Sequence, residues 1–406
     1  MLLIMDRFGL RSRPADVSAG AVLGLIRSGR AQTRADIATL TGLARSTVVQ
    51  RVDALLTAGF IREAGEGPST GGRPPTLLEF NARTGTVLAA DLGAIHCRLA
   101  VVDLAGEVLK ERPEDLRIED GPEHVLAWVQ DRFAKLLTAA GYTPRDVRGI
   151  GIGVPGPVEF ATGRPVAPPI MPGWDGVAIP RYFADRWSVP VLVDNDVNIM
   201  AVGEHRSQVW PDCDHMLYVK VATGIGCGIM AGGEIYRGAQ GCAGDIGHIR
   251  LDKRDDAICR CGNTGCLEAL ASGPAVARQL TERGYEAHNA RDVVARVRSG
   301  NRDAIELVRT AGRLIGDVLA GAVNLLNPQR ILIGGDLAAA DKPLLAGIRE
   351  SVYRQSPPLA TRDLDISRSR LGDRAGIVGA AHMVIEEILA SDKVDAELVA
   401  SIQPTP

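Results

Sequence analysis

Residues 216–230 have the sequence Met216-Leu217-Tyr218-Val219-Lys220-Val221-Ala222-Thr223-Gly224-Ile225-Gly226-Cys227-Gly228-Ile229-Met230. An apolar run enters a polar, glycine-rich turn and a second apolar run leaves it, which is typical of two strands joined by a tight turn. The same order recurs upstream, where residues 87–90 lead into Asp91-Leu92-Gly93-Ala94 and residues 97–103 form the next strand. Two such copies, each followed by helical sequence, predict a duplicated α/β body with a cleft between two lobes.

The composition is that of an ordinary globular protein. The chain has 406 residues, of which 46% are hydrophobic and 23% charged, and its net charge is −3. These values exclude the collagenous, disordered and coiled-coil classes, and the length predicts two or three domains. No apolar run approaches the ~18 residues that a membrane span needs. We therefore expect a cytoplasmic protein with no membrane partner, whose seven Cys are reduced thiols or metal ligands.

The charge is distributed unevenly along the chain. Residues 1–80 carry ten Arg, no Lys and seven acidic residues, so they are basic, whereas the remainder is acidic. Apolar residues between 19 and 60 recur at helical spacing in three runs. Thr33 and Asp36 form an acidic variant of the capping box at the start of the second run, and Gly42 supplies the turn before the third. This order predicts a helix-turn-helix.

The third helix, from about residue 44 to 58, is the candidate DNA-reading element. A recognition helix offers its amino-terminal side chains to base edges in the major groove. Two further strands, at residues 60–61 and 77–80, flank a Gly- and Pro-rich loop and predict a wing. The alternative is a three-helix module that binds another protein. The candidate DNA contacts are Arg45, Ser46, Thr47, Gln50 and Arg51 in the helix and Arg73 in the wing.

One His and three Cys form a candidate metal site. Cys259, Cys261 and Cys266 lie within eight residues that also hold two glycines, and His248 precedes them. One nitrogen and three sulfurs make a closed tetrahedral set for a structural Zn²⁺. Cysteines packed as small hydrophobic residues are the alternative, but their Arg, Asn, Thr and Gly neighbours argue against it.

Polar residues beside this set and at the end of another strand predict a sugar site. The apolar run at residues 191–193 ends in Asp194-Asn195-Asp196, where an α/β strand commonly presents ligand-binding groups. An Asx turn at the start of the next helix would explain one of Asn195 and Asp196. Sugar hydroxyls need both acceptors and donors. The candidate sugar contacts are Asn195, Asp196, Asp245, His248 and Glu268.

These residues resemble the ROK family (repressors, open reading frames, kinases) over about residues 15–385. The segment from Gly244 through His248 to Glu268 is similar to the family's zinc signature, and residues 69–74 after the helix-turn-helix are similar to its transcriptional regulators. The resemblance implies a two-lobed actin-like ATPase fold, a duplicated ribonuclease H-like body, with sugar between the lobes. It places Asn195, Asp196, His248 and Glu268 at the sugar contacts, with Asp196 at the catalytic-base position of the kinases. Asp245 stands where the family usually has Glu.

The resemblance also places a nucleotide site, in which one motif is altered. The family's first phosphate turn reads Asp, any residue, Gly, Gly, Thr, whereas this chain has Ala94 and Ile95 at the last two positions. These changes crowd the backbone and remove a hydroxyl donor, so we do not expect ATP and Mg²⁺ as cofactors. The phosphate-like positions are Asp91, Gly93, Thr223, Gly224, Gly226, Gly334 and Gly335.

We therefore predict a sugar-responsive regulator of transcription, a repressor that binds double-stranded operator DNA as a homodimer or homotetramer. The effector is a sugar or sugar phosphate. The alternative is an ATP-dependent sugar kinase, and a third possibility is a regulator that has lost its ligand. The expected parts are a winged helix-turn-helix at residues 15–82, a small lobe at 84–200 completed by a helix near 376–390, a large lobe at 201–375, and a flexible tail at 391–406.

Overall fold

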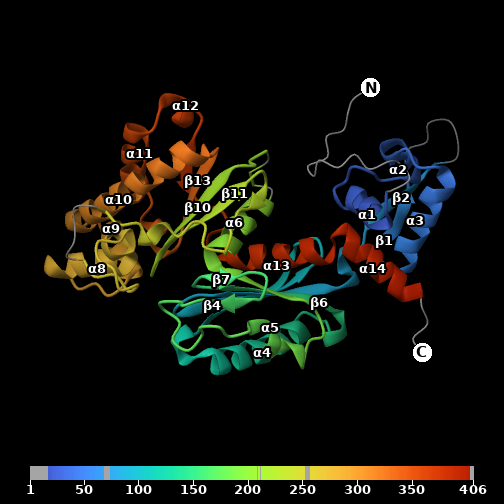
Figure 1. Cartoon of the computed structure of the whole chain (residues 1–406), viewed down its shortest axis with the longest axis horizontal. Coiled ribbons are helices and arrows are strands. Elements are labelled where there is room, and N and C mark those ends of the chain that lie inside the picture. The colour runs from blue at the N-terminus through green and yellow to red at the C-terminus, as the bar shows by residue number, and fades with distance from the viewer. Residues whose placement is uncertain (1–16, 68–73, 208, 211, 252–256, 403–406) are drawn as a thin grey trace. The chain divides into compact units, whose positions relative to one another are not determined.

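The computed structural model describes residues 17–67, 74–207, 209–210, 212–251 and 257–402 (Figure 1). They fall into two compact units. The first lies within Met1–Thr86, Asp103–Glu107 and Ile385–Pro406, and the second within Val87–Val102 and Val108–Val384. Among the described helices, none is both long and apolar enough to cross a bilayer.

The first unit contains the three helices and the hairpin that the sequence predicted. Thr33 and Asp36 form the capping box of the second helix, and Gly42 ends that helix at φ 72°, a left-handed conformation that suits glycine. The wing loop with Arg73 lies outside the described residues. The elements are α1 (Ala19–Arg27), α2 (Arg34–Thr41), α3 (Arg45–Thr57), β1 (Ile61–Glu66) and β2 (Thr76–Phe80).

The carboxyl-terminal segment is helical, so the flexible tail predicted from residue 391 is wrong for the part of it that the structure describes. Helix α14 (Ser391–Ile402) packs on α1 in the first unit. The backbone N–H of Gly20 donates to Asp395 Oδ1 at 2.9 Å, and Val394 and Leu398 are buried. Val394, Leu398 and Ile402 recur every four residues in this segment, a helical spacing that the sequence prediction overlooked.

The first sheet of the second unit has the strand order β5-β4-β3-β6-β9. Helices α4 (Pro122–Ala139) and α5 (Ile179–Ala184) cover one face, and α13 (Ala375–Ile388) lies on the other (Figure 1). A Cβ on Gly151 would lie 2.1 Å from the carbonyl oxygen of Ala380, so α13 needs a glycine there to pack closely. The strands are β3 (Thr86–Leu92), β4 (His96–Asp103), β5 (Val108–Asp115), β6 (Val147–Val154) and β9 (Val191–Asn195), and a separate ribbon pairs β7 (Val158–Glu159) with β8 (Arg164–Pro165).

The second sheet repeats the same order as β12-β11-β10-β13-β14. In each sheet the strands counted along the chain stand third, second, first, fourth, fifth, which confirms the predicted duplicated α/β body. The strands are β10 (Met216–Val221), β11 (Ile225–Ala231), β12 (Glu234–Ile235), β13 (Arg330–Gly334) and β14 (Asp365–Arg368).

Helices cover both faces of the second sheet. One face packs on a helical layer. On the other face, α6 (Asp196–Arg206) packs through Val197 and Ala201 against β10 and β11. The helices of the layer are α7 (Leu267–Ala271), α8 (Gly273–Glu282), α9 (Ala290–Arg298), α10 (Arg302–Leu326) and α11 (Lys342–Gln355), followed by α12 (Pro358–Thr361).

Candidate functional site

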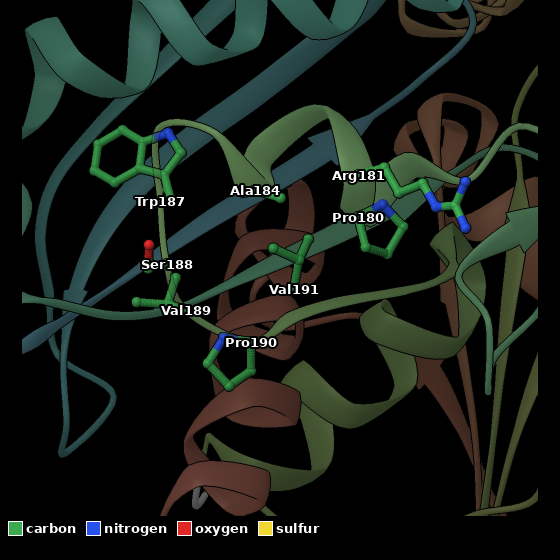
Figure 2. A pocket seen from close by; sticks show the side chains of 8 residues that line it. All are labelled: Pro180, Arg181, Ala184, Trp187, Ser188, Val189, Pro190 and Val191. Carbon is green, nitrogen blue, oxygen red and sulfur yellow. The ribbon is translucent and has the colours of Figure 1, made fainter.

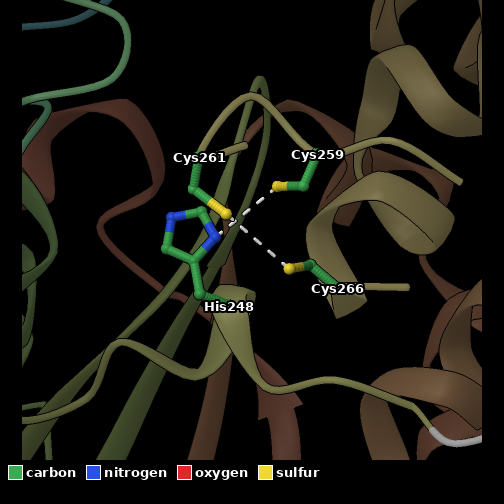
Figure 3. A group of neighbouring side chains, drawn as sticks. All are labelled: His248, Cys259, Cys261 and Cys266. Carbon is green, nitrogen blue, oxygen red and sulfur yellow. Dashed lines mark hydrogen bonds between the residues drawn. The ribbon is translucent and has the colours of Figure 1, made fainter. Parts of the chain in front are cut away.

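The predicted metal ligands lie together in the second unit. The ligand atoms of His248, Cys259, Cys261 and Cys266 are all within 4.8 Å of one another. Figure 3 shows the four side chains pointing toward a common centre, with His248 Nδ1 3.6 Å from Cys259 Sγ and the sulfurs of Cys261 and Cys266 3.8 Å apart. Three thiolates and one imidazole fit a tetrahedral metal ion, so this cluster can hold the expected Zn²⁺.

The loop that carries the cysteines has a defined backbone. Isolated bridges join Arg250 to Cys266 and Ile258 to Thr264, so the cysteine loop folds back on itself just before α7. Gly262 and Gly265 adopt φ values of 89° and 70°, which permit the two tight turns between the ligands. Local sequence thus brings three ligands together, and the short helix Ile246–His248 supplies the fourth.

Three of the predicted sugar contacts border this metal cluster. Asp245 Oδ1 lies 4.0 Å from His248 Nε2, the ring nitrogen that points away from the cysteines. Glu268 Oε2 accepts a hydrogen bond from the backbone N–H of Ile225 at 3.2 Å, and burial raises the pKa of the Glu268 carboxyl. A Cβ on Gly224 would lie 2.6 Å from Glu268 Oε2, so the glycine of the second turn makes room for this carboxylate.

Asn195 and Asp196 have different roles at the end of β9. Asn195 Oδ1 accepts from the backbone N–H of Val197 at 3.0 Å, and Asn195 Nδ2 donates to the carbonyl of Gly156 at 2.9 Å. Asn195 is therefore the helix cap that the sequence offered as an alternative for one of the pair. Asp196 is buried and instead forms an ion pair with Lys220 Nζ at 2.5 Å.

Sequence reasoning missed Lys220. It is the only charged residue in the apolar strand β10, and that position was a signal that could have found it. Lys is almost never fully buried without a partner, so a Lys within an apolar strand implies a carboxylate nearby. The two groups of predicted sugar contacts meet at the β10–β11 hairpin, since Asp196 pairs with Lys220 while Glu268 lies against Gly224.

The first phosphate-like turn lies beside the same lysine. Asp91 is buried at the end of β3, and burial raises the pKa of its carboxyl from 3.8 to about 7, although the Lys220 ammonium acts in the opposite direction. The backbone N–H of Gly93 donates to the carbonyl of His96 at 2.8 Å and closes the turn. Ile95, at the altered motif position, is 56% exposed and offers no donor to a phosphate.

A cavity of about 380 Å³ lies beside the first phosphate-like turn and Lys220, and its described lining includes none of the predicted sugar contacts. It brings together Asp91, Lys220 and Gly335 from among the residues discussed, and it adds charged side chains that the sequence did not single out. Burial lowers the pKa of one of these, His96. The added charged or titratable lining residues include His96, Arg98, Arg291, Asp336 and Asp373.

A second cavity, of about 520 Å³, lies elsewhere in this unit. Figure 2 shows its lining on α5 and on the segment that leads into β9, with Arg181 as its one charged side chain. It contains none of the predicted site residues, so it adds nothing to the sugar or metal site.

The candidate DNA contacts are in the first unit, at the start of α3. Arg45, Ser46 and Gln50 are exposed, while Thr47 and Arg51 are half-buried. Exposed side chains on the first turns of this helix have the placement that major-groove reading requires.

Comparisons with known proteins agree with this architecture. The putative xylose repressor of Caldicellulosiruptor sp. (strain Rt8B.4) is 36% identical over 382 residues, which cover 91% of this chain and 95% of that protein. A solved ROK family transcriptional regulator, a homolog of the E. coli MLC protein, matches with a TM-score of 0.79 and 28% identity over 94% of this chain and 98% of its own.

A kinase structure matches a smaller share of the chain. The ROK family glucokinase from Streptomyces griseus, solved with glucose and AMPPNP, has a TM-score of 0.64 and 27% identity over 74% of this chain and 99% of its own. The family model itself, described as the ROK family, matches residues 87–387. On this match and on its relatives, the chain belongs to the ROK family.

Proposed function

We propose that this chain is a transcriptional repressor whose affinity for operator DNA is set by a sugar bound at the β10–β11 hairpin. One combination carries the proposal: a head whose α3 begins with exposed Arg45, Ser46 and Gln50 is joined in one chain to a body with a hydroxyl-binding set of side chains. The relative named as a putative xylose repressor aligns over 91% of this chain and 95% of its own length, so the match extends beyond the body.

The sugar contacts that we propose are Asp196, Asp245, His248 and Glu268, with Asn195 contributing its remaining acceptor capacity. Carboxylates accept from sugar hydroxyls, and the N–H of the His248 ring nitrogen that faces away from the cysteines is available to donate. When Zn²⁺ is bound by the Cys3His cluster, it fixes the loop structure and leaves no open coordination position for catalysis. The chain's own carboxylates therefore do the recognition.

Helix α13 offers a route from the body to the head. Its Gly376 lies against Asp91, since a Cβ there would be 2.0 Å from Asp91 Oδ2, and Asp373 just before it lines the cavity. The last residues of α13, from Ile385, belong to the first unit, where α14 packs on α1. A ligand that shifts the start of α13 would act on the head through a continuous helix.

The test is a DNA-binding titration. Duplexes selected from genomic DNA by the full-length protein are titrated by fluorescence anisotropy with D-xylose, D-glucose, N-acetyl-D-glucosamine and their phosphates. We expect one of them to change the operator Kd by about 5–150-fold. Unchanged operator binding across this panel would contradict a sugar-responsive repressor.

A paired variant tests the head. Arg45→Ala should weaken operator binding by about tenfold or more, because an Arg at a base edge contributes ~1–3 kcal/mol. Arg62→Ala is the matched control, since Arg62 is exposed on β1 and pairs with Glu79 at 3.1 Å. Equal affinity of the two variants would exclude α3 as the reading helix.

An ATP-dependent sugar kinase is the second candidate. The glycines of the second phosphate turn and the likeness to the glucokinase body favour it. Ala94, Ile95 and the Asp196–Lys220 ion pair oppose it. ADP release coupled to NADH oxidation, measured with the same sugars, distinguishes the two candidates.

A further inference from the structure

Lys220 lies on β10 beside two glycines. Its partners across the sheet are Gly226 on β11 and Gly334 on β13, so neither neighbouring strand places a side chain directly beside it, and the Tyr218 ring lies over Gly334. The lysine stem can therefore cross to the carboxylates at the ends of β3 and β9. The side chains of Lys220 and Asp196 are only 16% and 8% exposed, which removes their ion pair from bulk water.

One carboxylate binds this ammonium group and a second lies near it. Asp196 Oδ2 lies 2.5 Å from Lys220 Nζ, and Asp91, which lines the same cavity as Lys220, interacts electrostatically with both. Burial alone would lower the pKa of Lys220, but Asp196, Asp91 and Asp336 outweigh it and raise that pKa. The lysine is therefore protonated at neutral pH.

This cation stands between the two phosphate-like turns, where phosphoryl transfer places a divalent ion. Such chemistry depends on Mg²⁺ held by carboxylates beside the phosphates. Here Asp91 belongs to the first turn, Lys220 enters the second, and the Asp196 carboxylate is already bound to the ammonium. A divalent ion at the same carboxylates would be repelled by the ammonium.

We propose that Lys220, bound to the Asp196 carboxylate and beside Asp91, takes the place of a divalent metal ion in this cavity. Asp196 is thereby kept as a hydrogen-bond acceptor for a neutral hydroxyl-bearing ligand, and it does not serve as a base for phosphoryl transfer. Lys220 is a positioning residue in this scheme, because it acts through the two carboxylates. The nature of the ligand rests on the proposed function, whereas the exclusion of metal does not.

The test is Mn²⁺ binding by the zinc-loaded full-length chain, followed by electron paramagnetic resonance of free Mn²⁺. Lys220→Met should create one Mn²⁺ site per chain that binds about tenfold or more tightly than any site of the wild type. Adding Asp91→Asn to Lys220→Met should abolish that site. Lys220→Arg keeps the charge and should match the wild type.

Lys135→Met is the surface control. Lys135 also pairs with a carboxylate, Asp131, at 2.7 Å, but on an exposed face of α4, so its loss should create no Mn²⁺ site. Circular dichroism melts verify that each variant folds. A purely structural lysine predicts a lower melting temperature for Lys220→Met without a new Mn²⁺ site, and that result would overturn the proposal.

The wild type provides an outcome that does not depend on any lysine variant folding. If the wild-type chain binds Mn²⁺ at a site that Asp91→Asn removes, Lys220 does not replace the metal and the proposal is wrong. No sugar or DNA enters these titrations. A chain that fails to respond to sugars therefore leaves this result unaffected, and a Mn²⁺-binding wild type leaves the repressor proposal standing.

Discussion

At the scale of single residues, the body places its chemistry in a few buried side chains whose partners decide their state. Asp91 and Asp196 are both buried acids, yet burial raises the pKa of the Asp91 carboxyl to about 7, whereas the Asp196 carboxylate is bound to the Lys220 ammonium group. The Cys3His cluster differs from both, because its four ligand atoms face one another and not the cavity. Each of these states can be measured separately.

The metal cluster predicts a simple stoichiometry. Metal analysis of the purified chain should give about one Zn²⁺ per chain, and Cys261→Ser should reduce it to near zero and lower the melting temperature, because metal binding free energy contributes to folding. Cys242→Ser is the control, since Cys242 is an exposed cysteine outside the cluster. Full zinc content in Cys261→Ser would contradict the assigned ligand set.

Asp91 predicts a pH dependence of stability. Its folded pKa of about 7 is above the ordinary 3.8, so the unfolded chain releases the proton first and the stability cost grows as pH rises from about 4 to 7. Relative to the wild type, Asp91→Asn should therefore gain about 2–3 kcal/mol in free energy of unfolding between pH 5 and pH 8. Urea denaturation at each pH measures the difference.

Asp131→Asn serves as the comparison for that profile. Asp131 is exposed, and its hydrogen bond from Lys135 lowers the pKa of its carboxyl, so its titration is complete well below pH 5. The difference between this variant and the wild type should be constant from pH 5 to pH 8. A constant difference for Asp91→Asn as well would show that Asp91 is ionised throughout.

At the scale of elements, the head is held together by a helix from the far end of the chain. A Cβ on Gly20 would lie 2.2 Å from the carbonyl oxygen of Ser391, whereas Gly24 on the same helix α1 has no atom within 4 Å of its Cβ position. Gly20→Ala should therefore displace α14. Gly24→Ala should stabilise the chain by up to ~1 kcal/mol, as alanine does in an exposed helix position.

Limited proteolysis distinguishes these two substitutions. Cleavage within residues 391–402, for example after Lys393, should be at least about tenfold faster in Gly20→Ala than in the wild type, because local opening exposes the helix to the protease. In Gly24→Ala the rate should be unchanged. Protection of α14 in both variants would mean that α14 does not depend on its contact with α1.

The elements show why some features could be predicted and others not. The cysteine cluster and the α2 capping box are set by residues a few positions apart, so spacing alone identified them. Helix α14 depends on α1 across more than 370 residues, as the Gly20–Asp395 hydrogen bond shows, and no local pattern encodes such a contact. For Lys220 the apolar strand around it was a local signal, but its acidic neighbours come from β3 and the start of α6 and could not be identified from spacing.

At the scale of the whole molecule, sugar binding by the duplicated body must change the free energy of DNA binding by the head if the chain is a sugar-responsive repressor. The two sheets share one strand order, and Lys220 on the second sheet interacts electrostatically with Asp91 at the end of a strand of the first. We expect a bound sugar to favour one conformation of the body. Helix α13 begins beside the Lys220 cavity, and its last residues belong to the head unit.

The coupling between sugar binding and DNA binding must be reciprocal. If a sugar weakens operator binding by a given factor, operator DNA must weaken sugar binding by the same factor, because both describe one coupling free energy of ~1–3 kcal/mol. Calorimetry of the effective sugar with and without saturating operator should therefore give the ratio found by anisotropy.

Glu268→Gln should weaken sugar binding while leaving the operator Kd without sugar unchanged, since Glu268 lies beside the second turn and not in the head. Glu282→Gln, an exposed change on α8, should alter neither affinity. Two ratios that differ by more than experimental error would show that the sugar acts through an irreversible process such as aggregation and not by shifting a conformational equilibrium, because an equilibrium coupling cannot depend on which ligand binds first.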